Sequence, residues 1–212
     1  MNNLRTIVLT CIISGFLAIP VVAQIFGIRG GLNISDCAIK VYDNTPLYTV
    51  PSFGIILGGT VEFKIGDKYS LETGLTLNDK GLKIPGGTDT ITHIRYLDIP
   101  LNAKYSFSLG KNRFYLSAGP YLGIGLYGIY LWKDSNGEYN GKRVQWGNNG
   151  AANEIKRPDY GINLGLEYEI RRILFGVQYG LGFANLGPQG YIYQSQKNRV
   201  LSVSLGYKFR KE

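Results

Sequence analysis

The chain has 212 residues, enough for one domain or two small ones. Its 29 glycines and 16 tyrosines favour many strands and turns and argue against an ordinary helical enzyme. The formal net charge is +8, but the sequence has no basic run with interleaved aromatic residues, which argues against nucleic acid as a partner.

Residues 1–23 are predicted to form a secretory signal peptide. Arg5 supplies a positive start, residues 7–19 are mostly apolar, and small residues precede a cleavage point after Ala23. The alternative is a retained membrane anchor, but the apolar run is short for a span. We therefore expect an exported domain of residues 24–212.

Cleavage would remove Cys11 and leave Cys37 as the only cysteine. A single cysteine cannot form an internal disulfide, so we expect no disulfide to stabilise the exported domain. We expect Cys37 to be a loop thiol without a role.

Eight segments alternate between apolar and polar residues, as the two faces of a strand do. Most are 10 to 15 residues long, and a tilted strand needs about 9–11 residues to cross a bilayer. The predicted strands are residues 25–35, 52–65, 69–79, 94–108, 113–128, 159–170, 172–184 and 198–209.

The connections between these segments fall into two classes. Short turns follow the second, fourth and sixth strands, at 66–68, 110–112 and Arg171. Long loops follow the others, at 36–51, 80–93, 129–158 and 185–197. Short turns at one end and long loops at the other indicate an up-and-down barrel in an outer membrane. The longest loop, 129–158, is polar and rich in glycine, so we expect it to be mobile and to form no core.

The glycines decide which face of the strands lies inside. Only Gly30 and Gly59 lie on the apolar face. Small residues are needed in the narrow interior of an eight-stranded barrel and gain nothing on an open surface. The apolar face therefore meets lipid, and its aromatic residues beside the short turns predict an interfacial girdle. Fourteen strand glycines share the polar face: Gly27, Gly31, Gly54, Gly58, Gly74, Gly119, Gly123, Gly125, Gly161, Gly165, Gly176, Gly180, Gly182 and Gly206.

The polar face also carries charged residues of both signs. Five acids and four bases are nearly balanced, which favours a paired polar plug over a conducting pathway. Pro100 shares this face and donates no ladder hydrogen bond, so we expect a bulge or broken pairing there. The predicted polar core of the lumen is Arg29, Glu62, Lys64, Glu72, Asp98, Lys104, Glu167, Glu169 and Lys208.

The sequence gives little sign of catalysis. The only histidine, His93, lies near the outer end of the fourth strand without a defined partner, and we predict no catalytic residue. No cluster has metal-ligand spacing, and we predict no metal or cofactor. Loop aromatic residues Trp132, Tyr139 and Trp146 are the candidates for binding a glycan, peptide or protein at the cell surface.

The strands resemble the PorT-like outer-membrane β-barrel proteins of the Bacteroidetes type. The resemblance covers residues 25–209 and implies an eight-stranded barrel in the outer membrane, without catalytic residues to carry over. The segments that carry it are GIRGGLNIS at 27–35, LETGL at 71–75, YLDIPL at 96–101, YLSAGPYLGIGL at 115–126 and NLGLEYEI at 163–170.

We therefore predict an all-β, eight-stranded antiparallel barrel in the outer membrane, in contact with lipid and lipopolysaccharide. A structural role or binding by the outer loops is the first hypothesis. A small porin-like channel is the alternative, and a lipid-modifying enzyme is the third.

Overall fold

The computed structural model describes residues 24–41, 44–86, 90–110, 112–134, 136–190 and 193–209. No helix among these residues is long and apolar enough to cross a membrane. The predicted signal peptide, residues 1–23, lies outside the described residues. The described strands are β1 (Gln24–Val41), β2 (Val50–Lys64), β3 (Tyr69–Ile84), β4 (Thr90–Leu109), β5 (Asn112–Lys133), β6 (Tyr139–Arg143), β7 (Pro158–Ile170), β8 (Ile173–Gly182) and β9 (Tyr193–Phe209).

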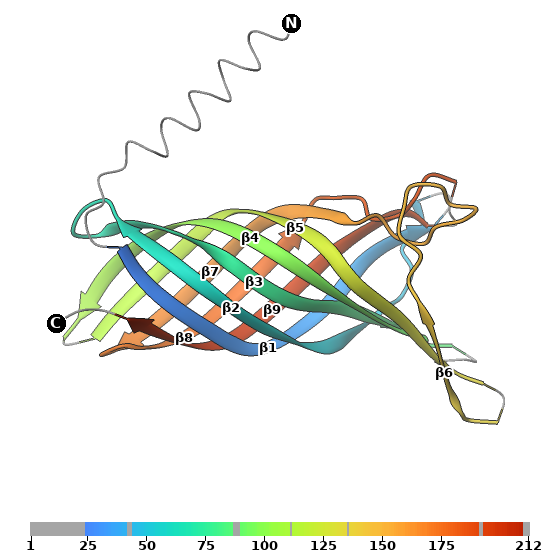
Figure 1. Ribbon diagram of the computed structural model, residues 1–212, viewed down its shortest axis with the longest axis horizontal. Coiled ribbons are helices and arrows are strands. Elements are labelled where there is room, and N and C mark those ends of the chain that lie inside the picture. The colour runs from blue at the N-terminus through green and yellow to red at the C-terminus, as the bar shows by residue number, and fades with distance from the viewer. Residues whose placement is uncertain are drawn as a thin grey trace, which may run out of the picture.

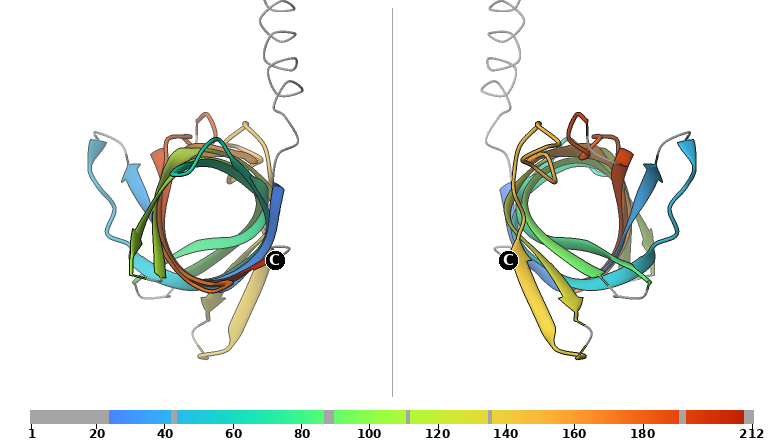
Figure 2. Two further views of the ribbon diagram at one scale, coloured as in Figure 1. Left: turned by 90° about the vertical axis from the view of Figure 1, so that its left-hand side faces the viewer. Right: turned by 90° about the vertical axis from the view of Figure 1, so that its right-hand side faces the viewer.

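Eight of these strands close into a ring (Figures 1 and 2). All the pairings are antiparallel, and the ring is completed where β1 pairs with β9 and β4 pairs with β5. Strand β6 stands outside the ring and pairs only with the outer end of β5 among the described strands. The predicted fold, an eight-stranded antiparallel barrel, is confirmed.

The register shows how alternation along the chain becomes an inside and an outside. Leu32 pairs with Ile55 and with Val203, and these three side chains are 50–61% exposed on the outer face. The next residue, Asn33, pairs with Gly54 and Ser202 and is fully buried. The apolar residues therefore face outward, where a membrane barrel meets lipid.

The interior is as crowded as the glycine pattern predicts. A Cβ atom added to Gly119 would lie 1.9 Å from the carbonyl oxygen of Leu101, and one on Gly31 would lie 2.1 Å from that of Val203. On the outer face, a Cβ atom on Gly30 would meet Leu57 Cδ1 at an ordinary 3.6 Å. The glycines of the polar face thus allow the strands to curve around a narrow lumen.

The short turns lie at the same end as the start of β1 and the end of β9 (Figure 1). They follow β2, β4 and β7, as predicted. Two of them use a left-handed backbone, with φ of +63° at Gly110 and +58° at Arg171.

Aromatic residues gather on the outer face at this end. The rings of Tyr69, Tyr105, Phe107, Phe114 and Tyr168 follow one another across β3, β4, β5 and β7 at centroid distances of 4.7 to 6.4 Å. Such a row matches the predicted interfacial girdle.

Pro100 interrupts the ladder between β3 and β4. Thr73 pairs with Leu101 and Thr76 pairs with Asp98, but no pair is formed by the described residues between them. The register is the same on both sides, so the break is a local loss of pairing and not a bulge. Thr73 Oγ1 instead donates to the Pro100 carbonyl at 2.8 Å.

The strands continue farther at their outer ends than predicted. Strand β1 runs to Val41 and β3 to Ile84. The expectation that Cys37 is a loop thiol is therefore wrong. It is buried on β1 beside Ile39 and Leu82, because β1 and β3 still pair with their neighbours beyond the apolar belt.

Candidate functional site

The predicted charged residues of the lumen form two groups. Eight of the nine lie inside the ring, whereas Lys64, on the same face at the end of β2, is exposed and does not belong to the buried core. The group nearer the short turns, here called the turn-side cluster, consists of Arg29, Glu62, Glu72, Lys104, Glu167, Glu169 and Lys208.

Lys104 lies at the centre of the turn-side cluster and is 2% exposed. Its Nζ lies 2.8 Å from Glu72, 3.8 Å from Glu62 and also contacts Glu167. These partners come from β2, β3 and β7, so one β4 side chain links strands on several sides of the ring. The contacts therefore cross the lumen.

Two further bases extend this cluster. Arg29 of β1 binds Glu72 at 3.1 Å and also Glu167, and Lys208 of β9 binds Glu62 at 2.6 Å. Unpaired charges would be very costly in such a buried place, so the alternation of acids and bases is a condition for folding.

The second group, the loop-side cluster, is built around Lys80, which is 4% exposed. Its Nζ lies 2.9 Å from Asp98 Oδ2 and 2.9 Å from Asp159 Oδ2. Asn78 donates to Asp98 at 2.7 Å, and Asn198 donates to Asp159 at 2.9 Å. The ammonium thus has two carboxylate partners, each held by an amide.

Gly123 allows the two carboxylates to approach each other. Asp98 of β4 and Asp159 of β7 both pair with Gly123 of β5, so the three residues form one row. A Cβ atom on Gly123 would lie 2.2 Å from Asp98 Oδ1. The missing side chain therefore leaves the room in which Asp98 and Asp159 reach one Lys80.

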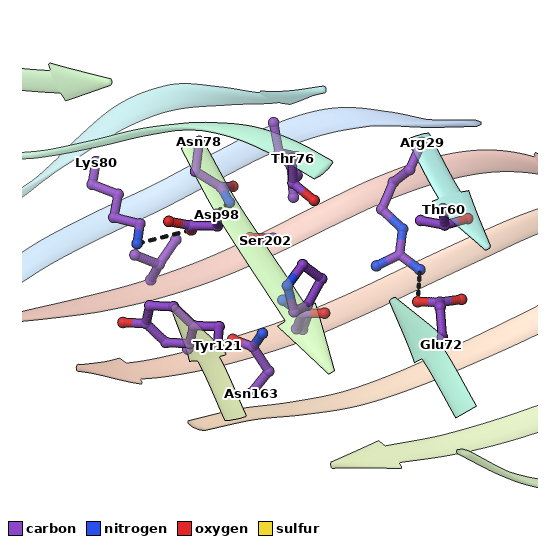
Figure 3. Close-up of a pocket in the computed structure, with 15 residues that line it drawn as sticks. Arg29, Thr60, Glu72, Thr76, Asn78, Lys80, Asp98, Tyr121, Asn163 and Ser202 are labelled. Atoms are coloured by element: carbon purple, nitrogen blue, oxygen red, sulfur yellow. Dashed lines mark hydrogen bonds and ion pairs between the residues drawn. The ribbon is translucent and has the colours of Figure 1, made fainter. Parts of the chain in front are cut away.

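A small cavity separates the two clusters (Figure 3). Thr60, Thr76, Asn163 and Ser202 are among its polar lining residues, and Lys80 with Asp98 marks one end. The cavity measures about 30 Å³, and one water molecule needs roughly 10–15 Å³ on this measure. It has space for a few water molecules.

The lumen also contains four functional residues that were not predicted from the sequence: Lys80, Asp159, Tyr115 and Tyr121. Lys80 falls one residue beyond the predicted end of its strand, although it continues the polar alternation of Glu72 and Asn78. Asp159, the second residue of β7, lies on the polar face and could have been found by the same alternation. The tyrosine rings lie under the ammonium groups, with Lys208 4.1 Å from the Tyr115 centroid and Lys80 4.6 Å from that of Tyr121.

Above the loop-side cluster, the connections after β5 and β8 fold together. The expectation that segment 129–158 forms no core is wrong. Val144, Ile155 and Leu186 are 0–5% exposed, and they pack with Ile94 and Tyr96 of β4. We call residues 144–157 and 183–190 the loop cap.

Backbone hydrogen bonds join the two segments of the loop cap. Lys156 N donates to Leu186 O at 2.8 Å, and Gly150 N donates to Gln189 O at 2.7 Å. Gly125 N donates to Arg157 O at 2.9 Å, which ties the cap to β5. The polar composition of the cap is compatible with order because its backbone groups are paired.

The three predicted binding aromatics do not form one surface. Trp132 pairs with Asn140 and Tyr139 pairs with Lys133, so successive positions place the two rings on opposite faces of the β5–β6 hairpin. This hairpin projects away from the barrel (Figure 1). Trp146 instead packs against the core of the loop cap.

The comparisons with known proteins agree with this architecture. The profile of the outer membrane protein beta-barrel domain family matches residues 22–187. The chain belongs to this family. It is an integral outer-membrane β-barrel protein, whose long loops face the outside. No curated protein matches the chain.

Several solved outer-membrane barrels are similar in structure. Ail of Yersinia pestis is 10% identical, with a TM-score of 0.47 over 88% of this chain and 99% of Ail. Neisserial surface protein A is 13% identical, with a TM-score of 0.44 over 87% of this chain and 97% of that protein. Escherichia coli outer membrane protein W is 18% identical, with a TM-score of 0.40 over 88% and 98%. The family assignment depends on the matched profile and the closed ring of strands, not on these three structures.

Proposed function

We propose that this outer-membrane barrel does not conduct, and that it holds the folded loop cap at the cell surface to bind a glycan or protein partner. The observation that carries the proposal is the ion-paired lumen. Lys104 and Lys80 each bind acids from two or more other strands, and the cavity between them measures only about 30 Å³.

A small channel is the alternative function. A conducting path would have to pass two buried ion clusters, whose contacts cross the lumen at different heights. The test is conductance of the purified, refolded protein in planar bilayers, with a large porin reconstituted in parallel. We expect no steady channels above the detergent background. Steady channels in wild-type protein would overturn the proposal.

A loop-replacement variant separates the effect of the loop cap on conductance from that of the ion clusters. Replacing residues 144–156 by a flexible linker removes most of the loop cap and leaves both ion clusters in place. We expect this variant to remain closed as well, because the ion pairs span the lumen. Channels in this variant alone would show that the cap is the barrier.

The binding role is tested by two deletions at the outer end. Replacing 144–156 removes most of the cap, whereas replacing 133–139 by Asn-Gly shortens the β5–β6 hairpin at the adjacent pair Trp132 and Asn140 and keeps Tyr130 and Lys142, which contact the cap. We expect envelope phenotypes or partner binding to be lost with the cap and kept with the shortened hairpin. Unchanged phenotypes in both variants would contradict the binding role.

We infer that the chain is not an enzyme. His93, the only histidine, pairs on β4 with Gly81 on one side and Ile129 on the other. Neither neighbour can exchange a proton with an imidazole. We expect His93→Ala to leave every measured envelope phenotype unchanged.

Contact with lipopolysaccharide is supported by bases on the outer face. Lys197 and Arg199 of β9 and Lys40 of β1 are exposed where these paired strands extend toward the loop end. Basic side chains at this height can meet the phosphates of the outer leaflet.

Within the family, we infer a PorT-like relationship. All five segments that carry the resemblance contribute residues to the lumen: Arg29 in 27–35, Glu72 in 71–75, Asp98 in 96–101, Tyr115 in 115–126 and Glu167 in 163–170. The resemblance therefore includes residues that build both ion clusters. No role in protein secretion is inferred.

A further inference from the structure

An open pocket of about 420 Å³ lies on the loop cap. This size is within the range of small-molecule sites, which is roughly 300–1,000 Å³, and far exceeds a single phosphate ion. Its lining residues are Trp146, Gly147, Asn148, Lys156, Arg157 and Pro158.

The charge of this region is positive. Residues 139–158 contain four bases and one acid, Glu154. The Glu154 carboxylate is already engaged, because it accepts hydrogen bonds from Lys142 Nζ and from Gln145 N, both at 2.7 Å. Lys156 and Arg157 are thus the charged side chains that line the pocket, and no acid lines it.

Arg157 is held in place by contacts on two sides. Its guanidinium carbon lies 5.3 Å from the centroid of the Trp146 ring, and its Nη1 donates to Gly125 O at 3.4 Å. A guanidinium has five N–H donors, so this arrangement orients the group and leaves donors for a ligand. The Arg157 side chain is exposed at the pocket.

Trp146 is also fixed. A Cβ atom on Gly125 would lie 2.3 Å from its Cη2 atom, so the indole lies directly over the glycine backbone. The Trp146 carbonyl accepts a hydrogen bond from Asn153 Nδ2 at 3.1 Å. Because the Trp146 side chain is already held in place, it loses little conformational entropy when a ligand binds.

The remaining polar side chain of the pocket is Asn148. Its Oδ1 accepts a hydrogen bond from Gln189 N at 3.4 Å, so its amide nitrogen can serve as a donor elsewhere. Lys156, Arg157 and Asn148 therefore all offer donors, and Trp146 and Pro158 add apolar surface. Because these three side chains offer hydrogen-bond donors and the pocket has no acidic side chain, the pocket favours an anionic ligand. The apolar surface of Trp146 and Pro158 is large enough to pack against a sugar ring.

We propose that this pocket binds an acidic saccharide, one that carries phosphate, sulfate or carboxylate groups. The inference rests on the surface-binding role proposed above and assigns its ligand class and place. The cap, and not the projecting β5–β6 hairpin, is then the recognition surface.

The chain has two tryptophans, so Trp132→Phe leaves Trp146 as the single indole reporter. We expect dextran sulfate to change the fluorescence of this variant in detergent with a saturable dependence on concentration. Neutral dextran of the same length should cause no change. Equal responses to both polymers, or no response to dextran sulfate, would overturn the proposal.

A matched pair of variants distinguishes the pocket from general charge attraction. In the Trp132→Phe background, Lys156→Gln with Arg157→Gln should weaken dextran sulfate binding by at least ten-fold. Lys133→Gln with Arg143→Gln removes the same charge from exposed bases of the projecting β5–β6 hairpin and should change it less than three-fold. Equal weakening by the two pairs would contradict a defined site.

Further probes separate the sources of such a ligand. Lipopolysaccharide with a complete phosphorylated core should bind, and a deep-rough form without core sugars should not, if the ligand belongs to the envelope. Binding of dextran sulfate without either lipopolysaccharide would point to a foreign glycan.

Polyglutamate that binds as tightly as dextran sulfate would overturn the saccharide assignment. None of these results depends on conductance, so failure here is distinguishable from failure of the closed-barrel proposal.

Discussion

Asp98 and Asp159 lie on opposite sides of Gly123 in one row of the barrel, and both bind the ammonium of Lys80 at 2.9 Å. The two acids come from strands that are not neighbours in the ring. One lysine thus joins β3, β4 and β7 across the interior.

Lys80→Met should be strongly destabilising. It leaves two buried carboxylates without their cation, and breaking a buried ion pair costs roughly 3–5 kcal/mol. The apparent free energy of unfolding in urea, with the barrel in detergent or vesicles, measures the effect.

The matched control is Arg95→Met. Arg95 also binds an aspartate, Asp79, at 2.6 Å, but its side chain is 47% exposed on the outside of the barrel. Exposed pairs contribute only about 0–1 kcal/mol. Similar losses in both variants would contradict a closed lumen in which the ion pairs of Lys80 are buried.

A pair of glycine substitutions tests which face is inside. Gly119→Ala should destabilise the barrel by about 1–3 kcal/mol, because the added methyl group would press on the Leu101 backbone and overpack the interior. Gly30→Ala, on the outer face, should change stability by less than about 0.5 kcal/mol. Urea unfolding of both variants, with the mobility shift of unheated samples on SDS gels, gives the comparison; a larger effect at Gly30 would reverse the assignment of the faces.

Sequence reasoning could assign these faces because period-2 alternation and glycine placement are local patterns that every strand repeats. It could not give the outer strand ends, because the apolar belt ends before the strand pairing does. Lys80 was missed for this reason, since its strand was predicted to stop at residue 79.

The loop cap could not be predicted for a different reason. Val144, Ile155 and Leu186 are isolated apolar residues in polar segments, and no local period connects them. Their common core arises only when the ring places the β5–β7 and β8–β9 connections side by side.

The core of the loop cap should unfold independently of the barrel. Ile155 is 1% exposed, and Ile155→Ala should cost about 2–5 kcal/mol in a packed site. We expect trypsin to cleave faster at Lys142, Arg143 and Lys156, while the unheated protein keeps its folded mobility on SDS gels. Tyr139→Ala, at a position that is 65% exposed on the projecting hairpin, is the control and should leave the cleavage rate unchanged. Loss of folded mobility with Ile155→Ala would show that cap and barrel unfold as one unit.

The turn between β5 and β6 should open in acid. The Asp134 carboxylate accepts hydrogen bonds from the backbone N–H groups of Glu138 and Asn136, both at 2.9 Å, and these bonds hold its pKa below the ordinary value of 3.8. A depressed pKa in the folded state means that the stabilising effect is fully present above the unfolded value, and that it is lost as the pH falls through the folded value. We expect amide exchange at Asn136 and Glu138 to be protected at pH 5 to 7, after correction for intrinsic rates, and to lose that protection below about pH 4. In Asp134→Ala the protection should be weak at every pH, and a wild-type-like acid transition in this variant would assign the effect to another group.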